Sequence, residues 1–160
     1  MKSNGANDSG HGTAARLIAL WATLHDTIVG AVKDGLGERG LRNILYQPLF
    51  EAGREAAVKD QPDATGVAEE IMRLEQDFDL RGRVLEKGPE RVVREVTECP
   101  WSSVRPASCK VFAWWMEGYC QGLNPAFRYR LEQLIAEGAE TCVWSVSRHT
   151  QRQRFPSPVV

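Results

Sequence analysis

The sequence contains no run of the ~18–20 apolar residues that an α-helix needs to cross a bilayer. Its opening stretch, MKSNGANDSGHG, is polar and lacks the apolar region of a secretory signal peptide. We therefore expect a cytoplasmic protein without membrane contact. In that compartment cysteines are more often free thiols, metal ligands or nucleophiles than partners in disulfides.

An excess of basic charge is absent as well. The chain has 20 Lys and Arg residues against 21 Asp and Glu residues, which gives a formal net charge of -1. Proteins that bind nucleic acids or anionic membranes through general electrostatic attraction carry a basic surplus. No nucleic-acid partner is therefore expected.

Several functional motifs are missing. Neither a glycine-rich phosphate loop nor a dinucleotide-binding fingerprint occurs. The four cysteines include no close pair such as CxxC, the spacing typical of structural zinc sites. Histidine is scarce, and only His25 falls within a predicted helix, so a Cys-His catalytic pair has little support. We predict no cofactor and keep zinc as an alternative.

The composition is that of one soluble domain. The chain has 160 residues, 42% of them hydrophobic, which is enough to bury a core without a disulfide or a metal. We predict a disordered tail over residues 1–12, a single domain over 13–148 and a loose tail over 149–160. The domain divides into a helical half, 13–79, and a second half, 80–148, that contains strands.

The helical half shows apolar residues at helical spacing. A first helix is predicted from the N-cap Thr13 to Gly35, and a second from about Glu38. Pro48 should kink or split that second helix, because its ring clashes with the preceding turn. The apolar positions that indicate the first helix are Leu17, Leu20, Trp21, Leu24, Ile28 and Val32.

A third helix is predicted after Pro62. Its core-facing stripe is Val67, Ile71, Leu74 and Phe78. The glutamates of this segment fall mostly off the stripe and are interpreted as a solvated face: Glu69, Glu70 and Glu75.

The second half alternates in the manner of strands. RGRVLEK and RVVREVTEC, separated by Gly88-Pro89, predict an antiparallel hairpin. A buried helix is predicted to open at Cys109, and FRYRLEQL and TCVWSVS then predict a second hairpin. Helices followed by strands indicate an α+β domain, an N-terminal helical half and an antiparallel β-β-α-β-β unit around a buried helix.

The cysteines gather in this second half. Cys109 lies near a helix N-terminus, where the backbone N–H groups favour a thiolate. Cys99 lies at a strand end beside a turn, where site residues are common. Cys120, within the helix, is interpreted as a core residue. Around them is a cluster of aromatic residues that either belongs to the core or lines an apolar pocket.

These motifs resemble the L-2-amino-thiazoline-4-carboxylic acid hydrolase family. The resemblance rests on Cys99 in ECPW, on Cys109 with Glu117-Gly118 eight residues later, and on the closing turn that ends in Cys142. It covers about residues 80–146. It implies an α+β fold, hydrolytic ring opening of a small cysteine-derived heterocycle, and Cys99, Cys109, Glu117 and Cys142 as catalytic positions.

The leading hypothesis is therefore a cysteine-dependent enzyme that acts on a C–N or C–S bond of a small molecule. Cys109 would be the nucleophile or the substrate anchor, and a nearby carboxylate would carry protons. The residues predicted to bind the substrate are Phe112, Trp115, Tyr119, Tyr129 and Glu132. A homodimer is compatible with the exposed strand edges.

The same half is similar to 4-vinyl-reductase-type ligand-binding domains, which suggests a second hypothesis. The chain would then be a non-catalytic sensor or carrier of a small molecule. That resemblance implies a zinc site with Glu132, Cys109 and Cys142, although Leu134 occupies the remaining cysteine position. A third hypothesis is an accessory protein that kept the fold and lost the chemistry, because Phe112 stands where the hydrolase family often has a polar residue.

Overall fold

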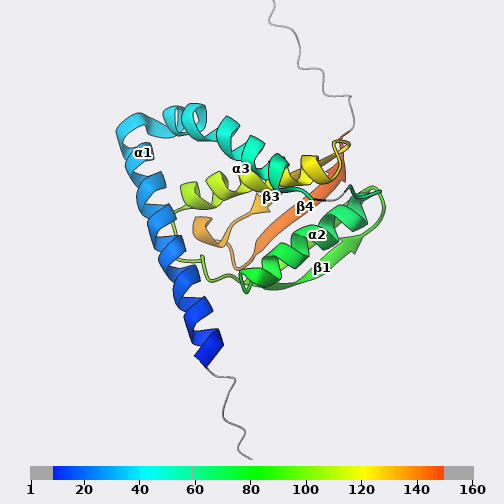
Figure 1. The fold of residues 1–160 in the computed structure, drawn as a ribbon, viewed down its shortest axis with the longest axis horizontal. Coiled ribbons are helices and arrows are strands. Elements are labelled where there is room, and N and C mark those ends of the chain that lie inside the picture. Colours follow the sequence, from blue (N-terminus) through cyan, green and yellow to red (C-terminus); the bar gives the residue numbers. More distant parts are fainter. Residues whose placement is uncertain (1–8, 59, 150–160) are drawn as a thin grey trace, which may run out of the picture.

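The computed structural model describes residues 9–58 and 60–149, with side chains from Arg16 onward. The remaining parts of the two predicted tails, 1–8 and 150–160, lie outside the described residues. Three α-helices and a four-stranded sheet make up most of the described chain (Figure 1). Their bounds are α1 Ser9–Ala56, α2 Ala64–Asp77, β1 Arg81–Lys87, β2 Arg91–Glu98, α3 Pro106–Leu123, β3 Phe127–Gln133 and β4 Cys142–Arg148. The predicted α+β class and the β-β-α-β-β order are confirmed.

The sheet has the order β1-β2-β4-β3, and every neighbouring pair is antiparallel. Both predicted hairpins are present, and β2 joins them by pairing with β4. One face of the sheet is apolar because alternate residues of each strand point the same way. Its fully buried members are Val92, Val96, Phe127, Trp144 and Val146.

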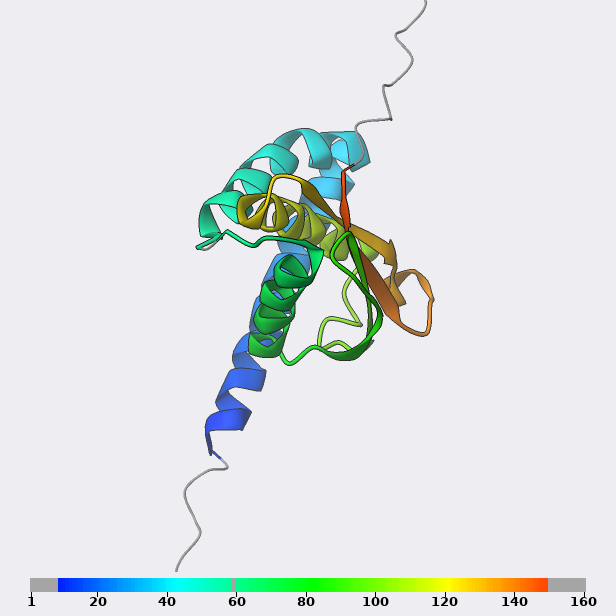
Figure 2. The same cartoon turned by 90° about the vertical axis from the view of Figure 1, so that its right-hand side faces the viewer.

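Helices α2 and α3 cover that apolar face, and Figure 2 shows both on the same side of the sheet. The core lies between them and the strands, where Val67 and Ile71 of α2 meet Met116 and Leu123 of α3. Helix α1 lies outside this layer and packs on α3 through Val29, together with other apolar residues of both helices. The site described below is therefore enclosed by α2, α3 and the sheet.

Helix α1 differs from its prediction. It begins at Ser9, before the predicted N-cap Thr13. Its interruption lies at Gly37, whose φ of 69° is left-handed, and the two parts meet there at a steep bend (Figure 1). Pro48 lies inside the helical second part, so the proline does not split the helix there. Glycine adopts a positive φ at little cost, whereas other residues would be strained there.

Helix α3 begins at Pro106 rather than at Cys109. Proline suits the first helical position because its fixed φ matches the helix and its missing N–H would have no partner there. Asp26 of α1 takes part in this helix end, since its carboxylate accepts from the backbone N–H of Arg105 at 2.8 Å and from the Ser108 hydroxyl at 2.7 Å. His25 hydrogen-bonds through Nε2 to the backbone carbonyl of Ser108 and packs against the Trp101 ring, so Asp26 and His25 fasten α1 to the start of α3.

Helix α2 has the predicted core stripe and a side-chain cap. Asp63 accepts a hydrogen bond from the N–H of Gly66 and so satisfies one of the free donors of the first turn. None of the helices in the described ranges is both long enough and apolar enough to span a membrane.

Candidate functional site

An apolar cavity lies between the C-terminal part of α2, the first turns of α3 and the sheet. It offers about 80 Å³ to the centre of a water-sized sphere. A single water needs ~10–15 Å³ on that scale, so the cavity could hold roughly six water molecules. Of the residues that the structure describes, no lysine, arginine or histidine lines it. Its walls are formed by Leu74, Glu75, Phe78, Leu80, Val96, Cys99, Trp101, Cys109, Phe112, Ala113, Trp115, Met116, Tyr129, Leu131, Leu134, Cys142 and Trp144.

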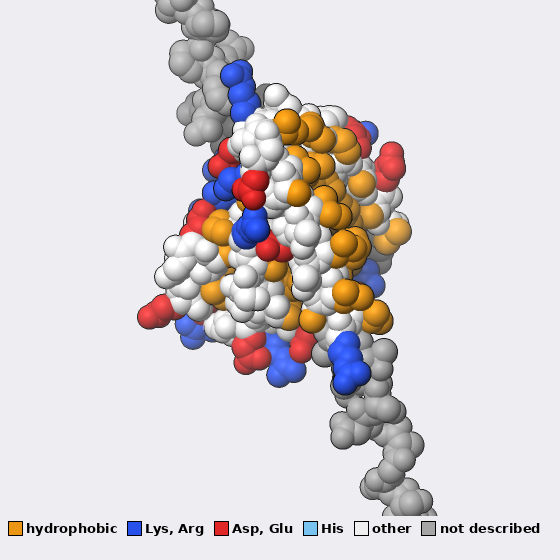
Figure 3. Space-filling view, turned by 90° about the vertical axis from the view of Figure 1, so that its left-hand side faces the viewer, with side chains coloured by type: hydrophobic (Ala, Val, Ile, Leu, Met, Phe, Trp, Pro, Cys, Tyr) orange, Lys and Arg blue, Asp and Glu red, His pale blue; other side chains and the backbone are white. Residues whose placement is uncertain are grey.

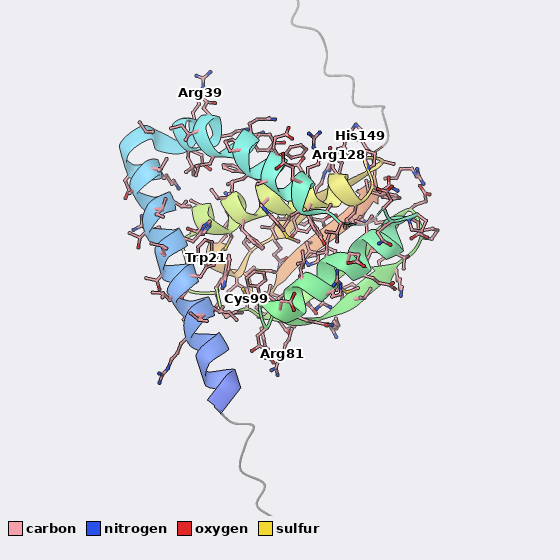
Figure 4. All side chains as sticks on the ribbon, viewed as in Figure 1. Trp21, Arg39, Arg81, Cys99, Arg128 and His149 are labelled. Carbon is pink, nitrogen blue, oxygen red and sulfur yellow. The ribbon has the colours of Figure 1, made fainter. Side chains whose placement is uncertain are left out.

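Three of the four cysteines converge on this cavity. Cys99 follows β2 and lies beside the C-terminal end of α2 (Figure 4), Cys109 comes from the first turn of α3, and Cys142 begins β4. All three are half-buried. Cys120 is fully buried in the main core, as predicted. The fold thus brings together the cysteines that the hydrolase motifs singled out and leaves the fourth one aside.

The convergence does not amount to a metal centre. Within the described ranges, no three His, Cys, Asp or Glu side chains are grouped closely enough to hold a metal ion. Zinc sites need three or four such ligands at ~2.0–2.3 Å from the ion. The three thiols line the same cavity but are not grouped closely enough to bind one metal ion.

Burial makes the thiols weak acids. Desolvation raises the pKa of Cys109 to about 12, and the neighbouring Cys142 and Cys99 add to the rise. Desolvation also raises the pKa of Cys99 and of Cys142. A backbone hydrogen bond from Trp101 opposes the rise at Cys99, and one from Ile135 opposes it at Cys142. A thiolate is the nucleophilic form, so at neutral pH this site holds three neutral thiols.

We expect Cys109 to resist alkylation by iodoacetamide. With a pKa of about 12 its thiolate fraction near pH 8 is on the order of 10⁻⁴, roughly a thousandfold below that of a free cysteine. Because the thiol stays mostly neutral up to about pH 11, the alkylation rate of Cys109 should continue to rise about tenfold per pH unit above pH 9, where the rate of a free cysteine levels off. Peptide mass spectrometry of timed reactions measures this, with the guanidinium-denatured chain as the control. A Cys109 that reacts at the denatured rate in the folded protein would contradict the raised pKa.

A buried ionic group closes one wall of the cavity. The Glu75 carboxylate accepts from the Arg94 guanidinium and from the indole N–H of Trp144, both at 2.6 Å. Burial raises the pKa of Glu75, and Arg94 and Trp144 oppose that rise. The prediction that Glu75 belongs to a solvated face was therefore wrong, since the residue is 7% exposed. Its spacing carried a signal, because it follows Ile71 of the core stripe by one turn.

One polar group of the cavity wall lacks a partner. Among the side chains that the structure describes, the indole Nε1 of Trp101 is the one buried nitrogen or oxygen without a hydrogen bond. Trp101 is 6% exposed and packs edge-on against Phe112 with 5.0 Å between ring centroids. A buried donor without an acceptor is costly. A ligand whose acceptor atom reached this N–H would therefore stabilise the protein. ECPW contained this residue, but sequence alone gave no sign of its unpaired N–H.

The other predicted site residues fall into three groups. Phe112, Trp115 and Tyr129 line the cavity with the cysteines. Glu117 and Glu132 do not, because they line a neighbouring groove between α3 and β3. That groove has a volume of about 230 Å³ on the same scale. Tyr129 lines both the groove and the cavity. Tyr119 lines neither space and is a buried core residue at 3% exposure.

Gly118, the second residue of the Glu-Gly motif, has a packing role. A Cβ atom there would overlap the backbone carbonyl of Phe50 on α1, and one on Gly53 would overlap that of Trp115 on α3. The two helices therefore cross with their backbones in contact. This explains why glycine stands at position 118 without any reference to chemistry.

Comparison with known proteins defines the fold and nothing finer. No family model matches the chain, and no curated protein matches it. A solved trafficking protein particle complex subunit 3 from Naegleria fowleri, covalently bound to palmitic acid, is similar with a TM-score of 0.64 and 10% identity, over 83% of this chain and 95% of that one. The phenol-responsive sensory domain of the transcription activator PoxR, solved with phenol, is similar with a TM-score of 0.58 and 14% identity, over 82% of this chain and 74% of that one. At such identities the shared property is the fold.

Proposed function

We propose that this domain binds a small, uncharged, mostly apolar molecule that carries one hydrogen-bond acceptor. The observation that carries the proposal is the apolar cavity together with the buried indole N–H of Trp101, which has no hydrogen-bond partner. A pocket with apolar walls and a few placed polar groups is the usual form of a small-molecule site.

The cavity wall also defines the charge of the ligand. Its one carboxylate, that of Glu75, is already paired with Arg94, which does not itself line the cavity. A carboxylate ligand would find no free cation, and burying an unpaired charge is very costly. A neutral molecule of about one substituted ring fits both the size and the polarity. The solved sensory domain of the same fold was crystallised with phenol, a molecule of this class.

Binding of phenol, acetophenone and toluene by isothermal titration calorimetry tests the proposal. Phenol and acetophenone offer an oxygen acceptor, whereas toluene has nearly the same shape and none. We expect both acceptor ligands to bind about 3- to 10-fold more tightly than toluene, because one hydrogen bond to the Trp101 N–H contributes ~0.5–1.5 kcal/mol.

The variant Trp101→Phe should abolish that preference while still binding toluene, since it keeps an aromatic wall without the N–H. Trp21→Phe is the matched control, because Trp21 lies on the outer side of α1, 53% exposed, and lines no part of the cavity. If no ligand of the panel binds the wild-type protein, or if Trp101→Phe keeps the preference, the proposal is wrong.

The cysteine-dependent hydrolase stays a second prediction, supported by the convergence of Cys99, Cys109 and Cys142 on one cavity. Their raised pKa values weigh against a resting nucleophile. Incubation with 2-amino-thiazoline-4-carboxylate distinguishes the two functions. Ring opening that is lost in Cys109→Ser would establish the enzyme, and the absence of turnover is what the binding function predicts.

A further inference from the structure

The first part of α1 exposes an apolar face to solvent. Figure 3 looks directly at this side of the molecule and shows a continuous band of hydrophobic side chains. Apolar patches this large on a soluble protein usually mark an interaction surface. The large members of the face are about half exposed or more: Leu17 61%, Leu20 66%, Trp21 53%, Leu24 49% and Ile28 52%.

The face carries no charge. The two titratable residues of this stretch, His25 and Asp26, point toward α3, where Ser108 binds both and Arg105 binds Asp26. What remains outward between Leu17 and Ala31 is aliphatic, aromatic or hydroxyl-bearing. The smaller exposed residues of the face are Ala19, Thr23, Thr27 and Ala31.

The spacing of the face suits a helix as its partner. Leu17, Trp21, Leu24, Ile28 and Ala31 follow one another at intervals of 4, 3, 4 and 3 residues. That alternation keeps side chains on a straight seam along one side of a helix, and it is the pattern by which two helices interlock.

A membrane surface is a poorer occupant. Helices that lie on a bilayer carry lysine and arginine beside their apolar face to meet the lipid headgroups. Here α1 itself carries neither between Leu17 and Ala31, and Arg16 and Lys33 lie just beyond the ends of the seam. The Arg105 guanidinium, which lies against Gly30, is already paired with Asp26 and Asp34.

We propose that this face is the interface of a homodimer, formed by antiparallel packing of α1 against α1 of a second copy. An uncharged face can meet itself without repulsion, as a two-fold interface requires. Leu24 lies at the midpoint of the seam, so a two-fold axis through it places Leu17 opposite the small Ala31 and Leu20 opposite Ile28. Each copy contributes on the order of 500 Å², and the pair buries ~1,000 Å², the lower bound of a specific interface.

Light scattering and sedimentation of the full chain test the proposal. The wild-type protein should be a dimer at micromolar concentration. Leu24→Glu puts two carboxylates against each other on the axis and should weaken the dimer at least 100-fold without changing the circular dichroism spectrum. Leu85→Glu is the matched control, because Leu85 is 52% exposed on β1 and lies on an unrelated surface. It should leave the dimer intact.

Cysteine cross-linking checks the orientation. In an antiparallel pair Leu24→Cys should form an intermolecular disulfide and Leu17→Cys should not, whereas a parallel pair would link both. A wild-type protein that is monomeric, a Leu24→Glu variant that stays dimeric, or a monomer that floats with phosphatidylserine vesicles would each overturn the proposal.

Discussion

Replacing Glu75 by Gln is expected to destabilise the protein by about 3 kcal/mol, because breaking a buried ion pair from one side leaves the other charge unpaired. Gln keeps an acceptor for the Trp144 N–H but gives Arg94 no counter-charge. The side chains of Glu75 and Arg94 are only 8% and 10% exposed, so water cannot take over the missing interaction. Urea unfolding at one fixed protein concentration measures the loss.

The paired variant Glu75→Gln with Arg94→Met provides the control. It removes the stranded cation as well, and the apolar side chain fits the packed wall of the core. We expect it to recover at least half of the loss, since a buried pair replaced as a whole by uncharged groups is often close to neutral. If Glu75→Gln unfolds at the wild-type midpoint, the ion pair is not buried in solution.

Gly118→Ala is expected to cost about 3 kcal/mol, at the upper end of what overpacking of a core usually costs. The added methyl group would overlap the carbonyl of Phe50, which belongs to the backbone of α1 and cannot turn aside as a side chain would. The helices must move apart, and the contacts on both sides of the crossing are lost with them. Loss of near-ultraviolet circular dichroism at a lower urea concentration would report it.

Gly35→Ala is the control for the intrinsic effect of alanine in a helix. Nothing lies within 4 Å of a Cβ at that position, so the change should stabilise the protein by about 0.5–1 kcal/mol through a less flexible unfolded chain. Opposite signs for the same substitution would establish that the crossing, and not helix propensity, sets the cost at Gly118. Equal effects at both positions would contradict the close approach of α1 and α3.

Local pattern was enough to predict the four strands and the two hairpins. The alternation of Phe127, Tyr129 and Leu131, and of Trp144 and Val146, reflects a two-residue period that one buried face imposes on a strand. Both hairpins are therefore confirmed. The pairing of β2 with β4 was not predictable, because it joins segments that are far apart in sequence and share no turn.

Helix boundaries and burial were harder. Leu17 and Leu24 indicated a helix correctly, but their period does not say whether the apolar face meets this chain or another surface. The sequence predicts a solvated face at Glu75, because an unpaired charge is rarely buried. Its partner Arg94 makes burial possible, but Arg94 lies on a strand that is distant in sequence. Cys99, Cys109 and Cys142 were singled out together by the family resemblance. The cavity that they line depends on tertiary packing and could not be read from the sequence.

The glycine crossing has a mechanical consequence. On one side α3 supplies Cys109, Phe112 and Met116 to the cavity, and on another it touches the backbone of α1 at Gly53 and Gly118. Contacts between long side chains yield by changing rotamers, but two backbones in contact have no such slack. Any expansion of the cavity that shifts α3 must therefore also shift the second part of α1, which follows the bend at Gly37 and carries Gly53.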